Sequence, residues 1–173
     1  LITPPKPTLP TYDGSSHELV TAGEVEPGAV IEYARSETGP YSTDIPTGIN
    51  AGDYTVWYRI PETENYTGIA ETEVTGVEIL RKQITPVVTL SDYTYLYDGG
   101  EKEPKVTVKD EDDVTVLLDT EYQVEYVNNR NVSTDGNPAK VVVTDKPGGN
   151  YAINQVEVEF KITLREQATL SIT

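Results

Sequence analysis

The chain has 173 residues, a length that suits one domain or two small ones, and its formal net charge is −16. Such an acidic surface repels nucleic acid and anionic lipid, so we expect neither as a partner. The absence of cysteine excludes disulfides, thiol nucleophiles and thiolate metal sites.

Composition predicts an all-β protein. The chain contains 12 tyrosines and many Val and Thr residues but no Met and one Phe, which suits half-buried strands better than helices. Val, Ile and Leu recur in short runs, which disfavours disorder. No apolar run approaches the roughly 20 residues that span a bilayer, so we expect no membrane insertion in this segment. Because the sequence begins at Leu1, we expect it to be a piece of a longer product.

A Tyr-Asp-Gly motif occurs at residues 12–14 and again at residues 97–99. Further short motifs follow each copy in the same order: VIEY and QVEY, YSTD and VSTD, Asn-Tyr in both, and finally LRKQ and LREQ. This order indicates a tandem repeat, with a first unit at residues 1–82 and a second at residues 83–173. The closing ATLSIT resembles VTLS in the second unit, so it is interpreted as the start of a third unit or as a last edge strand.

Tyr-Asp-Gly itself is interpreted as a structural corner. Aspartate accepts backbone N–H bonds in turns, and glycine adopts the positive φ that tight turns need. We therefore expect Gly14 and Gly99 to have positive φ, and the rings of Tyr12 and Tyr97 to pack inward as core residues.

Short alternating segments predict strands throughout. In DYTVWYRI, residues 53–60, and in QVEVEF, residues 155–160, every second side chain falls on the same face. No segment combines a sustained helical apolar spacing with helix caps, and Gly, Pro and Asn interrupt the chain at short intervals. Two small β-sandwiches joined near residues 80–86 fit this pattern best, and β-grasp-like repeats are the alternative.

Trp57 is the candidate ligand-binding residue. The alternation places it on the strand face opposite Tyr54 and Tyr58. A tryptophan in a strand is more often a core residue, and that interpretation is favoured here. The alternative is an exposed aromatic platform that binds sugars.

The densest group of carboxylates is the acidic run at residues 110–113. It is interpreted as a hairpin loop, and weak calcium binding through Asp110, Asp112 and Asp113 is the alternative. His17 is the only histidine and has no identifiable partners for a catalytic triad, and no carboxylate pair is recognisable. The sequence therefore predicts a protein that is not an enzyme and needs no cofactor.

The repeated motifs resemble the MBG and YDG-type repeats of bacterial cell-surface proteins, relatives of the bacterial immunoglobulin-like domains. The second unit departs from the pattern, since it carries GNPAKVVV where the first carries AGDYTV. The segments that carry the resemblance are YDGSSHELV, YSTDIPTGINAGDYTVWYRI, ENYTG, ITPVVTLSDYTYLYDG, VEYVNNRN and GNY.

This resemblance implies two tandem immunoglobulin-like β-sandwich domains in a secreted or surface-anchored bacterial protein. It implies an adhesive role or a spacer (stalk) role, and neither a cofactor nor catalytic residues. The expected location is extracellular or at the cell surface. The expected partners are neighbouring repeats of the same chain and a host or environmental glycan or protein. The alternative function is a carbohydrate-binding module that uses exposed aromatic side chains such as Trp57.

Overall fold

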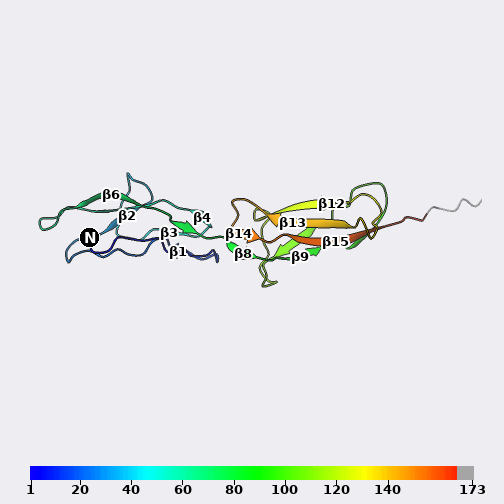
Figure 1. Ribbon diagram of the computed structural model, residues 1–173, viewed down its shortest axis with the longest axis horizontal. Helices are drawn as coiled ribbons and strands as arrows, with labels where there is room; N and C mark the ends of the chain where they lie inside the picture. Colours follow the sequence, from blue (N-terminus) through cyan, green and yellow to red (C-terminus); the bar gives the residue numbers. More distant parts are fainter. Residues whose placement is uncertain (167–173) are drawn as a thin grey trace, which may run out of the picture. The chain divides into compact units, whose positions relative to one another are not determined.

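The computed structural model describes residues 1–166, and these contain strands, turns and irregular segments but no helix. The described part therefore offers no long apolar helix of the kind that crosses a membrane. The all-β prediction is confirmed. The chain forms two compact units, Leu1–Lys82 and Gln83–Thr173 (Figure 1). The interpretation of ATLSIT as a third unit or an edge strand falls on residues 168–173, which lie outside the described part.

The first unit is built from short antiparallel pairs around one larger sheet. β2, β5 and β6 form the larger sheet in that order, while β1 pairs with β3 and β4 pairs with β7. The strands are β1 (His17–Glu18), β2 (Glu32–Ala34), β3 (Thr47–Gly48), β4 (Gly52–Asp53), β5 (Val56–Ile60), β6 (Ile69–Val74) and β7 (Glu78–Ile79).

Alternation along β5 decides which side of this sheet is buried. Val56, Tyr58 and Ile60 are enclosed, whereas Trp57 and Arg59 between them are partly exposed. Period-two geometry sends the two sets to opposite faces, and removal of the apolar set from water stabilises the unit. The other buried members of this core are Leu19, Val20, Ile31, Tyr33, Val74, Val77 and Ile79.

The second unit contains a four-stranded sheet in the order β10-β15-β13-β12, in which β12, β13 and β15 lie side by side (Figure 1). β9 pairs with β11, and β14 pairs with β8, which begins at the last residue of the first unit. The strands are β8 (Lys82–Ile84), β9 (Val87–Leu90), β10 (Thr94–Leu96), β11 (Val106–Lys109), β12 (Tyr122–Val127), β13 (Ala139–Asp145), β14 (Tyr151–Ile153) and β15 (Val156–Thr163).

The core of the second unit lies along β13. Val141 and Val143 are fully buried, and Val108 and Ile162 from other strands are buried with equal completeness. Phe160 of β15 meets the ring of Tyr95 edge to face, with 5.8 Å between the ring centres. Aromatic pairs in this geometry stabilise a core beyond the area that they bury.

In both units the residues just before Tyr-Asp-Gly pair in parallel with a segment near the end of the unit. In the second unit β10 runs parallel to β15, and in the first Thr11 forms a parallel bridge with Leu80. Tyr12 donates its backbone N–H to the Leu80 carbonyl at 2.8 Å, and Tyr97 donates to the Thr163 carbonyl at 2.9 Å. By these bonds Leu80 corresponds to Thr163. Alignment of LRKQ with LREQ would instead match Leu80 with Leu164, one residue later.

Candidate functional site

The two Tyr-Asp-Gly corners have the same turn geometry. Asp13 Oδ1 accepts the backbone N–H of Ser15 at 2.8 Å, and Asp98 Oδ1 accepts that of Gly100 at 2.9 Å. Gly14 has a φ of 82° and the glycine at position 99 has a φ of 84°, as predicted. This region of φ is unfavourable for side chains with a Cβ, which explains why glycine occupies both positions.

A cationic or imidazole side chain follows each aspartate at the fourth position. His17 Nε2 lies 2.8 Å from Asp13 Oδ1, and Lys102 Nζ forms an ion pair with the equivalent carboxylate of Asp98. The Ser15 backbone N–H and then His17 hold the pKa of Asp13 below its usual value. Lys102 and then the Gly100 N–H lower the pKa of Asp98. Sequence comparison missed this correspondence because histidine and lysine look unrelated.

The prediction that the tyrosine rings are core residues is wrong for Tyr97 and holds only in part for Tyr12. Tyr12 is half-buried against the edge of the first core, whereas Tyr97 is 39% exposed. In both corners the tyrosine hydroxyl lies 4.0 Å from the place where a Cβ on its own glycine would be, at Gly14 and Gly99. Each ring is thus turned over its own corner, which keeps it out of the centre of the core.

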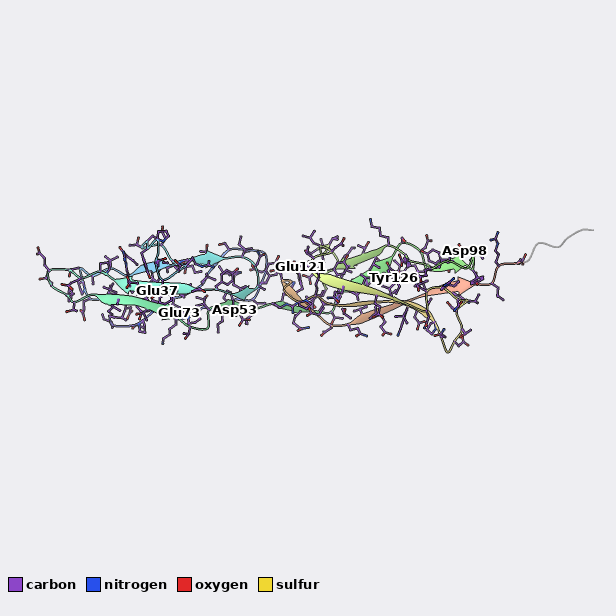
Figure 2. The ribbon with its side chains drawn as sticks, turned by 90° about the horizontal axis from the view of Figure 1, so that it is seen from above. Glu37, Asp53, Glu73, Asp98, Glu121 and Tyr126 are labelled. Carbon is purple, nitrogen blue, oxygen red and sulfur yellow. The ribbon has the colours of Figure 1, made fainter. Side chains whose placement is uncertain are left out.

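Trp57 lies on the solvent side of the β2-β5-β6 sheet. It is half-buried, so the favoured interpretation of a core tryptophan is wrong. Its cross-strand neighbours are Ala34 on β2 and Glu73 on β6. Figure 2 labels the Glu73 side chain. An indole beside a carboxylate on a partly wet face has one apolar surface and one polar neighbour, the combination by which proteins hold a sugar ring.

Arg59 organises the polar side chains on the same face as Trp57. Its Nε lies 2.8 Å from Glu32 Oε2, its guanidinium lies 3.6 Å from Glu71, and it stacks 4.3 Å from the centre of the Tyr41 ring. The hydrogen bond to Glu32 is the main cause of a raised Arg59 pKa. Desolvation and then Glu71 raise the pKa of Tyr41, so its hydroxyl stays neutral at physiological pH.

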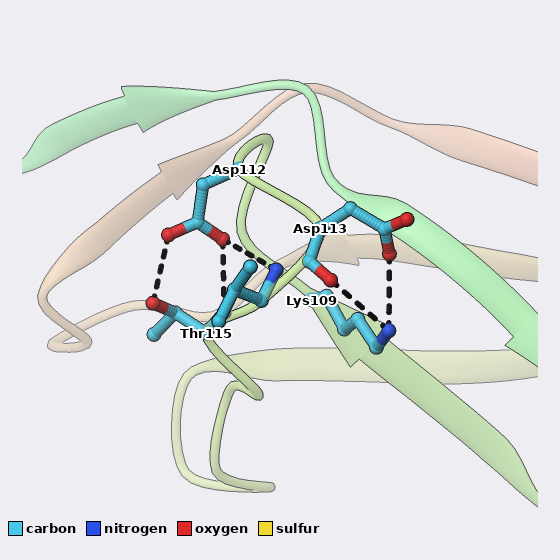
Figure 3. A network of polar contacts seen from close by, with 5 residues as sticks. Lys109, Asp112, Asp113 and Thr115 are labelled. Atoms are coloured by element: carbon cyan, nitrogen blue, oxygen red, sulfur yellow. Dashed lines mark hydrogen bonds and ion pairs between the residues drawn. The ribbon is translucent and has the colours of Figure 1, made fainter.

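The acidic run forms a hairpin loop after β11, closed by a hydrogen bond from the Asp110 N–H to the Thr115 carbonyl at 2.8 Å. Asp112 accepts the backbone N–H groups of Val114 and Thr115, each at 2.8 Å, and the Thr115 hydroxyl at 2.9 Å. Asp113 pairs with Lys109 Nζ at 3.0 Å (Figure 3). These two carboxylates are thus bound to separate groups within the loop.

Asp110, the third candidate calcium ligand, is 2% exposed, and its Oδ1 accepts the Glu111 backbone N–H at 2.7 Å. Within residues 1–166, no three His, Cys, Asp or Glu side chains are grouped as they would be around a metal ion. The three aspartates therefore do not come together in this structure. Calcium binding by the loop would require its internal hydrogen bonds to rearrange.

Sequence reasoning missed a shallow hollow of about 460 Å³ in the second unit. Tyr93, which is 48% exposed, forms one side, and the exposed side chains of Asp135, Glu159 and Lys161 contribute carboxylates and an ammonium group. A backbone hydrogen bond of 2.9 Å from the Lys161 N–H to the Tyr93 carbonyl brings these distant segments together. The only sequence signal was VSTD, which supplies three of the lining residues.

No family model, no curated protein and no solved structure matches the chain.

Proposed function

We propose that the chain is a non-enzymatic extracellular repeat module from a bacterial surface or secreted protein. Its two units are immunoglobulin-like β-sandwiches that act as adhesive or spacer domains. The observation that carries this proposal is the duplicated arrangement in which an aspartate-glycine corner follows a parallel backbone pairing with a segment near the end of the unit, a single bridge in the first unit and a pair of strands in the second. The β-grasp alternative has less support, because residues 1–166 contain no helix.

The Tyr-Asp-Gly corner has a structural role in both units. Asp13 and Asp98 use their carboxylates on their own turns, and the tyrosine rings lie over the same turns. Side chains that bond within their own turn stabilise the unit itself, and such a unit can be repeated along a chain. The net charge of −16 adds solubility and long-range repulsion between repeats, which suits a module exposed to solvent.

Domain replacement in the parent protein separates the adhesive role from the spacer role. Both units are replaced by two unrelated, well-folded domains of similar length, and binding of cells to host or environmental surfaces is measured. Retained binding shows that the units are spacers, and lost binding shows that they are adhesive. Antibodies raised against the chain should label intact cells, and external protease should remove the label. Labelling only after lysis contradicts the extracellular assignment.

Carbohydrate binding is the second candidate, favoured by the half-exposed Trp57 and by the hollow beside Tyr93. A glycan array probed with the intact chain tests it, with Trp57→Ala and Tyr93→Ala measured separately. The matched control is Tyr66→Ala, because Tyr66 is also an exposed aromatic residue, at 36%. Loss of a glycan signal in one variant but not in the control identifies the site. An array with no signal removes this candidate.

A further inference from the structure

The segment that follows the acidic loop, residues 114–118, lies along the open side of β11 in the β9–β11 sheet and pairs with it at Val116. Val116 bridges Lys109, and hydrogen bonds lie on both sides of this pair, from the Leu117 N–H to the Val108 carbonyl at 2.9 Å and from the Asp110 N–H to the Thr115 carbonyl at 2.8 Å. In an antiparallel ladder this pattern turns the N–H and C=O of the bridged residue away from its partner. The backbone groups of Val116 therefore face outward.

Three large apolar side chains project from this edge. Val114 is 78% exposed, Val116 is 59% exposed and Leu118 is 70% exposed, while Leu117 between the last two is buried at 5%. All three lie within five residues around the Val116 bridge. Isolated exposed apolar residues are common on proteins, but three so close together beside an open backbone edge form a surface suited to an added strand.

Turns at both ends hold residues 114–118 in place before anything binds to them. At the start of the segment Asp112 binds the N–H groups of Val114 and Thr115, and Lys109 holds Asp113 (Figure 3). At the other end the Leu118 carbonyl accepts the Glu121 N–H at 2.9 Å. A preformed edge lowers the ordering cost that an incoming strand would otherwise incur.

Charge selects the kind of strand that can bind. Exposed acidic residues stand on both sides of the edge, Glu111 to Asp113 before it and Asp119 after it. A second copy of this chain, also at −16, would be repelled, as would an anionic lipid surface. We propose that residues 114–118 bind an extended basic segment of another protein, which adds as a strand through Val116 and places alternate apolar side chains against the three exposed ones.

The test uses the whole chain and a short synthetic peptide in which lysine and valine alternate. Binding is followed by amide NMR, and hydrogen exchange of the Val116 N–H is measured with and without peptide. We expect exchange at Val116 to slow by about tenfold, equivalent to a further 1.4 kcal/mol of protection. A peptide alternating glutamate and valine should not bind, and a peptide alternating lysine and serine should bind much more weakly.

Variants distinguish binding at residues 114–118 from general electrostatic attraction between the acidic chain and a basic peptide. Val116→Pro removes the outward N–H together with one of the three exposed apolar side chains, a change that a sheet edge tolerates, and should abolish binding without a large fall in melting temperature. Val114→Ser with Leu118→Ser should weaken binding severalfold, whereas Leu164→Ser, at an equally exposed leucine elsewhere (78%), should not. Four results would each overturn the proposal. The lysine–serine peptide could bind as well as the lysine–valine peptide, or the amide shifts could be confined to another strand. The lysine–valine peptide could fail to bind, or the chain could dimerise through this edge.

Discussion

Lys102 forms an ion pair with Asp98 across the second corner, in the position that His17 takes toward Asp13 in the first. The pKa of Asp98 is lowered chiefly by Lys102, so the folded state favours the ionised carboxylate. The stability that this charge contributes is fully present above the unfolded pKa, near 3.8, and is lost as pH falls through the lower folded pKa.

Asp98→Asn is therefore expected to lower the melting temperature of the second unit at neutral pH. Its difference from the wild type should shrink as pH falls through the unfolded pKa and vanish below the lower folded pKa, as measured by circular dichroism melts across the acidic range. Asp135→Asn is the control, because Asp135 is exposed and has no ion pair within the described residues. A difference between Asp98→Asn and the wild type that stays constant down to the lowest pH would contradict the assignment.

Gly14→Val and Gly99→Val should each destabilise their own unit by about 1–3 kcal/mol, the cost of placing a branched side chain at positive φ. Steric clash adds little, since an added Cβ meets only a tyrosine hydroxyl at 4.0 Å. Denaturant unfolding measures the change. Gly136→Val is the control, because a Cβ there enters open space and the backbone is outside the positive-φ region. Equal costs at all three positions would show that φ is not the cause.

Tyr12→Ala and Tyr97→Ala should have different effects although the motif is the same. Tyr12 packs against the first core, so its truncation should cost about 2–3 kcal/mol, below the value for a fully buried aromatic residue. Tyr97 is 39% exposed, so its truncation should cost about 1 kcal/mol. Denaturant melts of the two variants give the comparison, and a larger loss for Tyr97 would refute the difference in burial.

Asp112→Ala should destabilise the second unit by about 1–2 kcal/mol, because it removes the acceptor for two backbone N–H groups and one hydroxyl. Asp112→Asn, which keeps one carbonyl oxygen, should cost less. Neither EDTA nor added calcium should change the melting temperature of the wild type. A calcium-dependent rise that Asp112→Ala removes would mean that the loop rearranges into a metal site.

Glu121→Ala should cost about 1–3 kcal/mol, because it removes a largely buried carboxylate that accepts from two part-buried donors of Asn150. The Glu121 carboxylate accepts the Asn150 backbone N–H at 2.6 Å and its side-chain amide at 3.0 Å, and Glu121 is only 8% exposed. Glu125→Ala is the matched control, since this glutamate is exposed on the neighbouring strand β12. Thermal melts in which the two variants lose equal stability would mean that the Asn150 contacts contribute nothing.

Local chemistry made part of this structure predictable. The strand β5 follows from simple alternation, and the corners at Gly14 and Gly99 follow from the turn preference of Asp-Gly. Period two shows which side chains share a face, but it does not show which face is buried. The interpretation of Trp57 as a core residue rests on how often tryptophans in strands are buried, and in the structure Trp57 is half-buried on the solvent side of its sheet.

Contacts between distant segments were not predictable from the sequence. The parallel pairing of β10 with β15 and the hollow that joins Tyr93 to Asp135 depend on how separate strands assemble. The Asn-Tyr motif illustrates the same limit, because Tyr66 is 36% exposed whereas Tyr151 is 8% exposed. Equal sequence at these positions is therefore compatible with different packing in the two units.

The parallel pairing of β10 with β15 determines how the second unit responds to tension. Force that reaches β10 from its N-terminal side and β15 from its C-terminal side pulls the two strands past each other along their length. The hydrogen bonds between them lie across that direction, so they bear the load together instead of opening one at a time. In the first unit a single parallel bridge, between Thr11 and Leu80, lies at the corresponding place. The same pull on the first unit would fall on one bridged pair instead of three.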